Sequence, residues 1–181
     1  MTIAVAALLS ACAAAPEPPF DPAPADGPCV PMAGVIGEGT TLDGRAGVYR
    51  LEMINEDGER RTAGTLTLVA QLDSMRTVGE ATSTLYGSTT ARPADVGAPA
   101  VGGLESLDPA APGVLVLEGN GDGGRSVLLR LGSGLNRRDV TYFDAASVVL
   151  EVRHVDADGF AGNWRGEVST RSTRGHFCAV R

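Results

Sequence analysis

The chain contains no lysine, and all 15 of its basic residues are arginines. Without a lysine amine, the protein cannot form a lysine Schiff base with a carbonyl substrate or with pyridoxal phosphate. It also lacks the lysine of a phosphate-binding P-loop. Acidic side chains number 22, which gives a net charge of −7. Because such a surface repels phosphate groups, we expect no nucleic-acid partner and no electrostatic attraction to anionic lipid.

Histidine and cysteine are also scarce. The two histidines, His154 and His176, lack the short paired spacing typical of zinc ligands, and the Asp-Gly turns lack the full spacing of a calcium-binding loop. No Gly-x-Ser-x-Gly motif marks a nucleophile. We therefore assign no catalytic residue, no metal and no cofactor. A pair of carboxylates of the glycosidase type stays open, because only the fold can bring such a pair together.

Glycine and proline, with 24 and 11 residues, are plentiful, and short runs of Val, Leu and Thr alternate with them. This composition is typical of an all-β domain with many turns. The glycine-rich stretch at Gly119–Gly124 matches the Gly-x-Gly-x-x-Gly spacing of dinucleotide sites. A nucleotide site would require a helix after it, whereas the alternating residues 125–131 predict a strand. We therefore interpret this stretch as a hairpin turn.

The strand predictions rest on alternation of apolar and polar side chains. Residues 48–53 place Tyr49, Leu51 and Met53 on one face. The next strand, at residues 65–72, is expected to direct four side chains inward: Leu66, Leu68, Ala70 and Leu72. Further strands are expected at 81–88, on both sides of the glycine-rich turn, between 139 and 169, and at the C-terminus. The long segment Thr89–Gly113 has no usable period and is expected to be a functional or a disordered loop.

About nine strands joined mostly by short turns predict a single antiparallel up-and-down β-barrel of about eight to nine strands. The alternative is a two-sheet β-sandwich. We favour the barrel because its closure leaves no exposed edge on strands that lack protective lysines. The barrel domain is expected to span residues 29–181, with the long loop near 89–113.

The amino terminus carries an apolar run, Ile3–Leu9, that is too short to cross a bilayer. The residues after it, Leu9-Ser10-Ala11-Cys12, resemble the lipobox of bacterial lipoproteins. The resemblance implies a signal peptide at residues 1–11 and acyl chains, palmitate among them, on Cys12. It also implies a location in the cell envelope, on the periplasmic face of the outer membrane. Several acyl chains anchor a protein stably, where a single chain is marginal.

Residues 12–28 are rich in proline and alanine and predict an extended tether between the lipidated cysteine and the barrel. If Cys12 carries lipid, Cys29 and Cys178 remain. Because an envelope lipoprotein matures in an oxidising compartment, these two are expected to form a disulfide. In the loop-entropy model a bridge across so long a loop contributes about 4–5 kcal/mol.

The Gly-x-Trp element at Gly162–Trp164, in a small barrel with a terminal disulfide, is similar to the lipocalin-like, or calycin, class. In lipocalins, however, this element lies in the first strand. Small inward residues (Ala, Val and Gly) and few aromatics could leave a void in a barrel of eight or more strands, for which the candidate ligand-binding residues are Tyr49, Leu51, Phe160 and Trp164. The other interpretation of this stretch is a core strand, in which glycines leave room for the large rings.

Three functions remain open at this point. The first is a lipid-anchored binding module that holds a small apolar or amphipathic ligand in its interior. The second is a structural or interaction lipoprotein with a solid barrel, whose surface or long loop meets another envelope protein. The third is a hydrolase-type enzyme. The first two differ in one observable property, which is whether the barrel interior is hollow or packed.

Overall fold

A computed structural model describes residues 29–37, 39–71, 76–78, 81–121, 124–135, 148–168 and 171–181. The predicted signal peptide, Cys12 and the tether therefore lie outside the described residues. Within those residues no helix combines the length and the apolarity needed to cross a bilayer.

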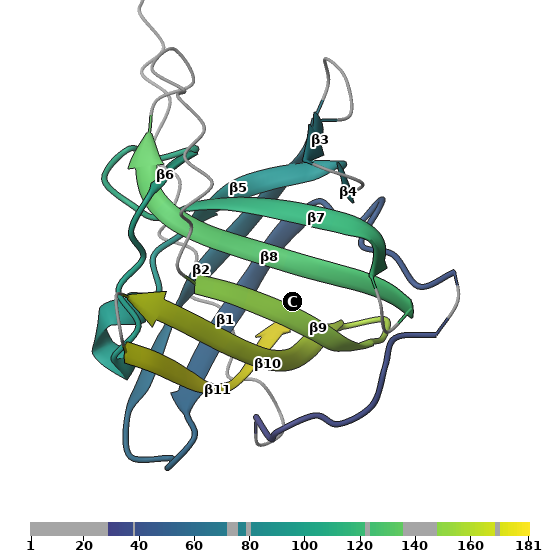
Figure 1. Cartoon of the computed structure of the whole chain (residues 1–181). Helices are drawn as coiled ribbons and strands as arrows, with labels where there is room; N and C mark the ends of the chain where they lie inside the picture. The colour runs from purple at the N-terminus through teal and green to yellow at the C-terminus, as the bar shows by residue number, and fades with distance from the viewer. Residues whose placement is uncertain are drawn as a thin grey trace, which may run out of the picture.

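Eight antiparallel strands form a closed barrel (Figure 1). Each of these strands pairs with the next one along the chain, and β1 pairs with the last strand, β11, to close the ring. Successive strands are thus neighbours, which confirms the up-and-down barrel and rules out the two-sheet sandwich. The eight strands are β1 (Gly47–Asn55), β2 (Arg61–Ala70), β5 (Leu85–Thr89), β7 (Gly113–Gly121), β8 (Gly124–Leu135), β9 (Val148–Val155), β10 (Gly159–Val168) and β11 (Arg171–Val180).

Three short strands flank the barrel. β3 (Arg76–Val78) pairs with β4 (Ala81–Ser83), and β4 meets β7 at one residue pair. β6 (Gly103–Glu105) runs parallel to the end of β8. The predicted third strand at 81–88 is therefore two strands, β4 and β5. The glycine-rich stretch at 119–124 joins β7 to β8, and β8 is a strand, which confirms the hairpin interpretation.

Alternation along the strands positions the core. Tyr49, Leu51 and Met53 on β1 are all 1% exposed or less, as predicted. On β2, Leu66 and Leu68 are equally buried. The prediction for Ala70 is wrong, because it is the last residue of β2 and its side chain is exposed where the strand leaves the barrel. Leu72 lies outside the described residues.

The two ends of the barrel are filled by different segments. At the end where β1 begins, the preceding coil inserts Ile36 and Leu42 into the core cluster. At the opposite end the Thr89–Gly113 segment supplies buried Ala91, Val96 and Ala98 and forms the 3₁₀ helix η1 (Pro93–Val96). This segment, which was expected to be a functional or a disordered loop, is a packed cap.

Candidate functional site

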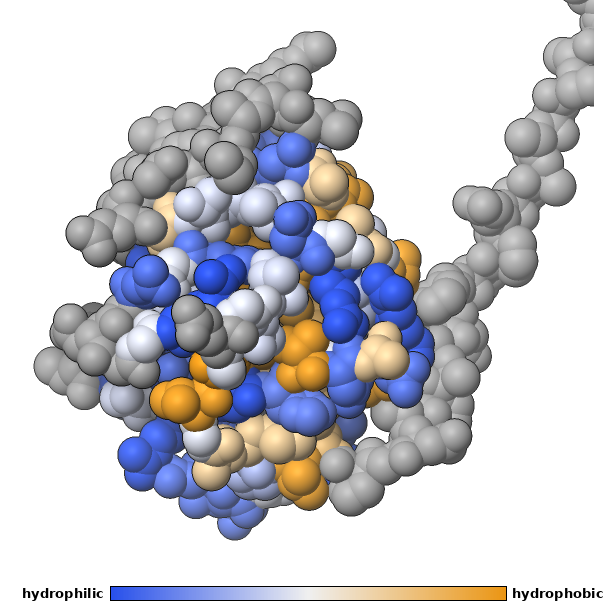
Figure 2. Space-filling view, turned by 90° about the vertical axis from the view of Figure 1, so that its right-hand side faces the viewer, coloured by the Kyte–Doolittle hydropathy of each residue, from blue (hydrophilic) through white to orange (hydrophobic). Residues whose placement is uncertain are grey.

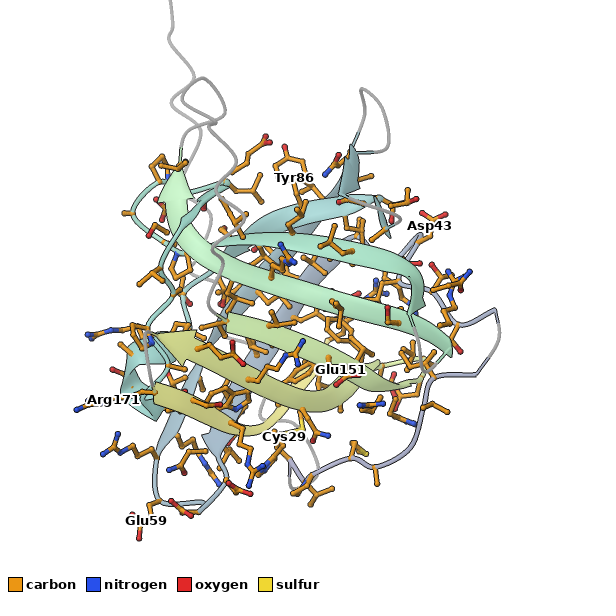
Figure 3. All side chains as sticks on the ribbon, viewed as in Figure 1. Cys29, Asp43, Glu59, Tyr86, Glu151 and Arg171 are labelled. Atoms are coloured by element: carbon orange, nitrogen blue, oxygen red, sulfur yellow. A yellow bond between two sulfur atoms is a disulfide. The ribbon has the colours of Figure 1, made fainter. Side chains whose placement is uncertain are left out.

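The four candidate ligand-binding residues come together inside the barrel, and their side chains are packed against one another. Tyr49, Leu51, Phe160 and Trp164 are each 2% exposed or less and belong to one core cluster. The rings of Tyr49 and Phe160 meet edge to face with centroids 5.2 Å apart. Phe160 meets Phe177 in the same way at 6.3 Å. Figure 3 draws the side chains of the described residues on the barrel strands.

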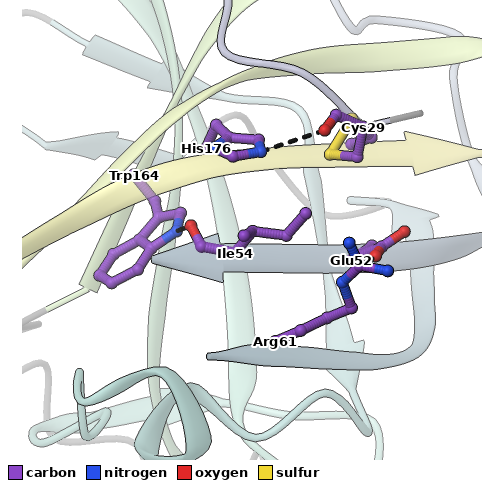
Figure 4. Close-up of a disulfide and its surroundings, with 7 residues drawn as sticks. Cys29, Glu52, Ile54, Arg61, Trp164 and His176 are labelled. Atoms are coloured by element: carbon purple, nitrogen blue, oxygen red, sulfur yellow. Dashed lines mark hydrogen bonds and ion pairs between the residues drawn. A yellow bond between two sulfur atoms is a disulfide. The ribbon is translucent and has the colours of Figure 1, made fainter. Parts of the chain in front are cut away.

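The polar atoms of these residues are already bonded within the protein. The Trp164 Nε1–H donates to the Ile54 carbonyl oxygen at 2.9 Å, as Figure 4 shows. The Tyr49 hydroxyl donates to the Arg45 carbonyl oxygen at 2.7 Å and accepts from the Arg181 guanidinium at 3.0 Å. A ligand in the interior would therefore have to displace side chains and break these hydrogen bonds.

The disulfide between Cys29 and Cys178 is present, with Cα atoms 5.6 Å apart. It links residues separated by 149 positions and fixes the start of the domain to its last strand. Cys178 alternates with the inward-facing Phe177 and Ala179, so the bridge lies on the outer face of the barrel, beside β11 (Figure 4).

From Cys29 the chain crosses the outside of the barrel before it enters β1. We call the segment Cys29–Ala46 the strap. In Figure 1 it is the purple segment that wraps around the outside of the strands. Three successive strands each hold one of its carbonyl oxygens. His176 Nε2 on β11 lies 3.1 Å from the Cys29 oxygen, Asn163 on β10 donates to Met32 at 2.9 Å, and Arg153 on β9 donates to Gly34 at 2.7 Å.

The far end of the strap is held by a buried carboxylate. Glu118 on β7 is 7% exposed and accepts hydrogen bonds from the Leu42 N–H, at 2.7 Å, and from the Thr41 hydroxyl. Arg125 on β8 pairs with Glu118 at 3.1 Å and donates to the Thr40 carbonyl oxygen at 2.7 Å. This network places Leu42, which is fully buried, in the barrel end.

Beside the disulfide, a hollow of about 240 Å³ opens on the outer surface of the barrel. Both cysteines line it, together with Met32, Val180 and the side chains of the β9–β10 turn. In that turn His154 lies 3.3 Å from Asp156, and both side chains are 53% exposed. The hollow is smaller than most small-molecule sites, which measure about 300–1,000 Å³.

The Asp156 carboxylate organises the β9–β10 turn. Its Oδ1 accepts the N–H groups of Asp158 at 2.9 Å and of Gly159 at 2.8 Å. Partial burial favours the neutral acid, but these two hydrogen bonds and the neighbouring His154 outweigh it. The pKa of Asp156 is therefore lowered from its ordinary value. Because the carboxylate already accepts two backbone hydrogen bonds within the turn, we assign Asp156 a structural role.

The two histidines lie in different places. His154 is part of the β9–β10 hairpin, whereas His176 is 9% exposed beneath the strap. The Cys29 carbonyl oxygen can only accept, so the Nε2 atom of His176 carries the proton in their hydrogen bond. Among the described residues, no three His, Cys, Asp or Glu side chains gather closely enough to hold a metal ion.

Comparison of the chain with protein-family models, with curated proteins and with solved structures found no match. The two resemblances, to the lipobox and to lipocalin-like barrels, therefore remain predictions from the sequence.

Sequence reasoning missed the residues that hold the strap. They are Glu118, Arg125, Arg153 and Asn163. Each lies 76 to 131 positions in the sequence from the strap residue to which it is hydrogen-bonded. One signal was available, since Glu118 directly follows the apolar run Val114–Leu117 within the expected strand. A single acidic residue there suggests a partner, but the sequence does not show which.

Proposed function

We propose that the protein is a lipid-anchored envelope protein whose solid barrel acts through its outer surface, as a structural or interaction module for another envelope protein. The observation that carries this proposal is the packed interior. The core positions of all eight strands are filled, and the ring of Phe160 contacts the rings of Tyr49 and Phe177. An interior of this kind supplies stability and leaves recognition to the surface.

The outer surface offers a mixture of chemical groups. Figure 2, which views the side on the right of Figure 1, shows hydrophobic residues in small groups among hydrophilic ones. The exposed large hydrophobic side chains of the described residues are scattered over the strap and the cap: Val30, Val35, Val101 and Leu107. Protein surfaces that bind other proteins transiently are about as apolar as the rest of the surface, so this mosaic suits such a partner.

The anchor is tested separately from the barrel. Mass spectrometry of the membrane fraction should find acyl chains on Cys12. The Cys12→Ser protein should leave that fraction, because the chains that hold it there are gone. A Cys12→Ser protein that stays membrane-bound would refute the anchor while leaving the description of the barrel intact.

The solid interior is tested with apolar ligands. A panel of fatty acids, phospholipids and indole should produce no thermal shift in the wild-type protein. The Trp164→Ala variant is the positive control, because it should lose about 3–5 kcal/mol of stability and regain part of it with indole in the vacated space. A saturable thermal shift of the wild type by any member of the panel would favour the alternative, a barrel that holds an apolar ligand.

The interaction itself is tested in the envelope. A photo-reactive amino acid at Val35, which is 68% exposed, should cross-link to one defined partner protein. The same probe at Ala179, which is fully buried, should not. A second probe at Leu107 samples the opposite end of the barrel. If neither Val35 nor Leu107 gave a discrete cross-linked protein, the proposal would be contradicted.

A further inference from the structure

Two junctions of the barrel wall are sparsely paired. Three residue pairs join β5 to β7, and four join β8 to β9, Leu128–Leu131 with Val148–Glu151. We call the β8–β9 junction the seam. Both strands of the seam continue beyond these pairs, β8 back to Gly124 and β9 on to Val155, and all of these residues are described. No pairing joins Gly124–Val127 to Val152–Val155 in this part of the structure. By comparison, ten pairs join β10 to β11.

A β-bulge in β9 explains the seam. Ala161 on β10 pairs with His154, but Gly162 pairs with Val152, so Arg153 is the extra residue. A bulge bends its strand and increases its twist, which turns β9 away from β8. The bulge requires glycine on the facing strand, because a Cβ atom at Gly162 would lie 2.0 Å from the Glu151 carbonyl oxygen.

The strap lies across this seam. The bulged residue Arg153 on one side of the seam holds the Gly34 carbonyl oxygen, and Arg125 on the other side holds that of Thr40. Between these anchors in the sequence is Ile36, which is 8% exposed and belongs to the core cluster. The strap therefore supplies apolar cover where the two strands do not pair.

The strap has little of its own to hold it in place. It contains no helix or strand among its described residues, and Gly34, Gly39 and Gly44 adopt positive φ. Its two ends are fixed elsewhere, by β1 at one end and by the disulfide at the other. With both ends fixed, docking the strap orders only a short loop. With the disulfide cut, the strap becomes a free tail, and docking it costs more conformational entropy.

We propose that the strap is a latch on the β8–β9 seam and that the Cys29–Cys178 disulfide keeps it docked, so that reduction opens the barrel wall. A dithiol carries out the reduction. One of its thiolates attacks a sulfur of the bridge and breaks the S–S bond, and its second thiol then displaces the mixed disulfide. The products are two cysteine thiols and an oxidised dithiol, with two electrons and two protons transferred. Both cysteines line the 240 Å³ surface hollow, which gives a small dithiol access to the bridge.

The test measures hydrogen exchange along the full chain. Cys12→Ser removes the third thiol in every sample. The bridge is broken in two ways, with dithiothreitol and with the double variant Cys29→Ser/Cys178→Ser. The matched control is Asn163→Ala, which removes one strap hydrogen bond and keeps the bridge. Trp164, the single tryptophan, is 2% exposed and reports on the intact barrel through its emission wavelength.

Breaking the bridge should accelerate exchange in strap residues 33–42 by roughly tenfold or more, with β10 and β11 still protected and Trp164 emission unchanged. The control should change strap exchange by less than about threefold. Two outcomes would overturn the proposal. Unchanged strap protection would show that the hydrogen bonds alone hold the latch. Joint loss of strap and barrel protection, with a red shift of Trp164, would show that the bridge stabilises the whole fold and not the latch.

Discussion

Gly175 on β11 lets Trp164 reach its hydrogen-bond acceptor. A Cβ atom at this position would lie 1.9 Å from the Ile54 carbonyl oxygen and 2.7 Å from Trp164 Nε1. Both are backbone or ring atoms within the packed wall and cannot move aside cheaply. Gly175→Ala should therefore lower the free energy of unfolding by about 1–3 kcal/mol, measured by urea denaturation.

The matched control for this glycine is Gly37 in the strap. Its Cβ would have only one neighbour, the Thr40 hydroxyl at 3.9 Å, and its φ is not in the left-handed region. Gly37→Ala should change stability by less than about 0.5 kcal/mol. Equal stability of the two alanine variants would contradict the role assigned to Gly175.

At the scale of elements, the β9–β10 hairpin gives a pH dependence. The pKa of Asp156 is lowered in the folded protein, because the N–H groups of Gly159 and Asp158 and the nearby His154 stabilise its carboxylate more than burial opposes it. A lowered folded-state pKa contributes stability that is present above the unfolded value of 3.8 and is lost as the pH falls through the folded value.

Asp156→Ala should therefore cost stability at pH 7 but little at pH 2. The loss at pH 7 is expected to stay under about 1 kcal/mol, because a carboxylate that is half exposed is screened by solvent. Urea denaturation at both pH values checks this, with Asp43→Ala, an exposed carboxylate of the strap, as the comparison. A destabilisation of Asp156→Ala that is the same at pH 7 and pH 2 would contradict the linkage.

The strap depends on one buried carboxylate. Glu118→Ala removes the acceptor of the Leu42 N–H and leaves the Arg125 guanidinium without its carboxylate partner. Leaving buried or half-buried polar groups unpaired is costly, so the variant should lose about 2–4 kcal/mol of unfolding free energy in urea denaturation.

Glu56→Ala is the control for Glu118. Glu56 pairs with Arg174 at 2.7 Å, but its side chain is 58% exposed, so its loss should cost less than about 1 kcal/mol. If Glu56→Ala proved as damaging as Glu118→Ala, the burial argument for the strap anchor would fail.

The sequence allowed prediction of whatever depends on local pattern. Alternation at Tyr49, Leu51 and Met53 identified the inward face of β1, and short turns implied neighbouring antiparallel strands. Counting cysteines identified the bridge. The position of the strap could not be predicted, because side chains of five strands bind its backbone. Every residue has a backbone carbonyl, so the sequence does not indicate which carbonyls accept these hydrogen bonds. The packed interior was equally hidden, since the same alternation suits a hollow barrel and a filled one.

At the scale of the whole molecule, the closed ring of strands predicts an order of opening. Ten residue pairs join β10 to β11, and nine join β7 to β8, whereas four join β8 to β9 and three join β5 to β7. Local opening costs free energy in proportion to the hydrogen bonds and apolar contacts that it disrupts. The barrel should therefore open first at the β5–β7 junction and the β8–β9 seam, and last around β11, which is also fixed by the disulfide.

Native-state hydrogen exchange of the oxidised protein measures this order directly. After correction for intrinsic rates, amides of Leu128–Leu131 that bond across to β9 should exchange at least about tenfold faster than those of β10 that bond to β11. Amides of β8 that bond to β7 provide an internal comparison on the same strand and should exchange slowly. Faster exchange at the β10–β11 ladder than at the seam would contradict the prediction. It would mean that neither the number of paired residues nor the disulfide determines which strands separate first.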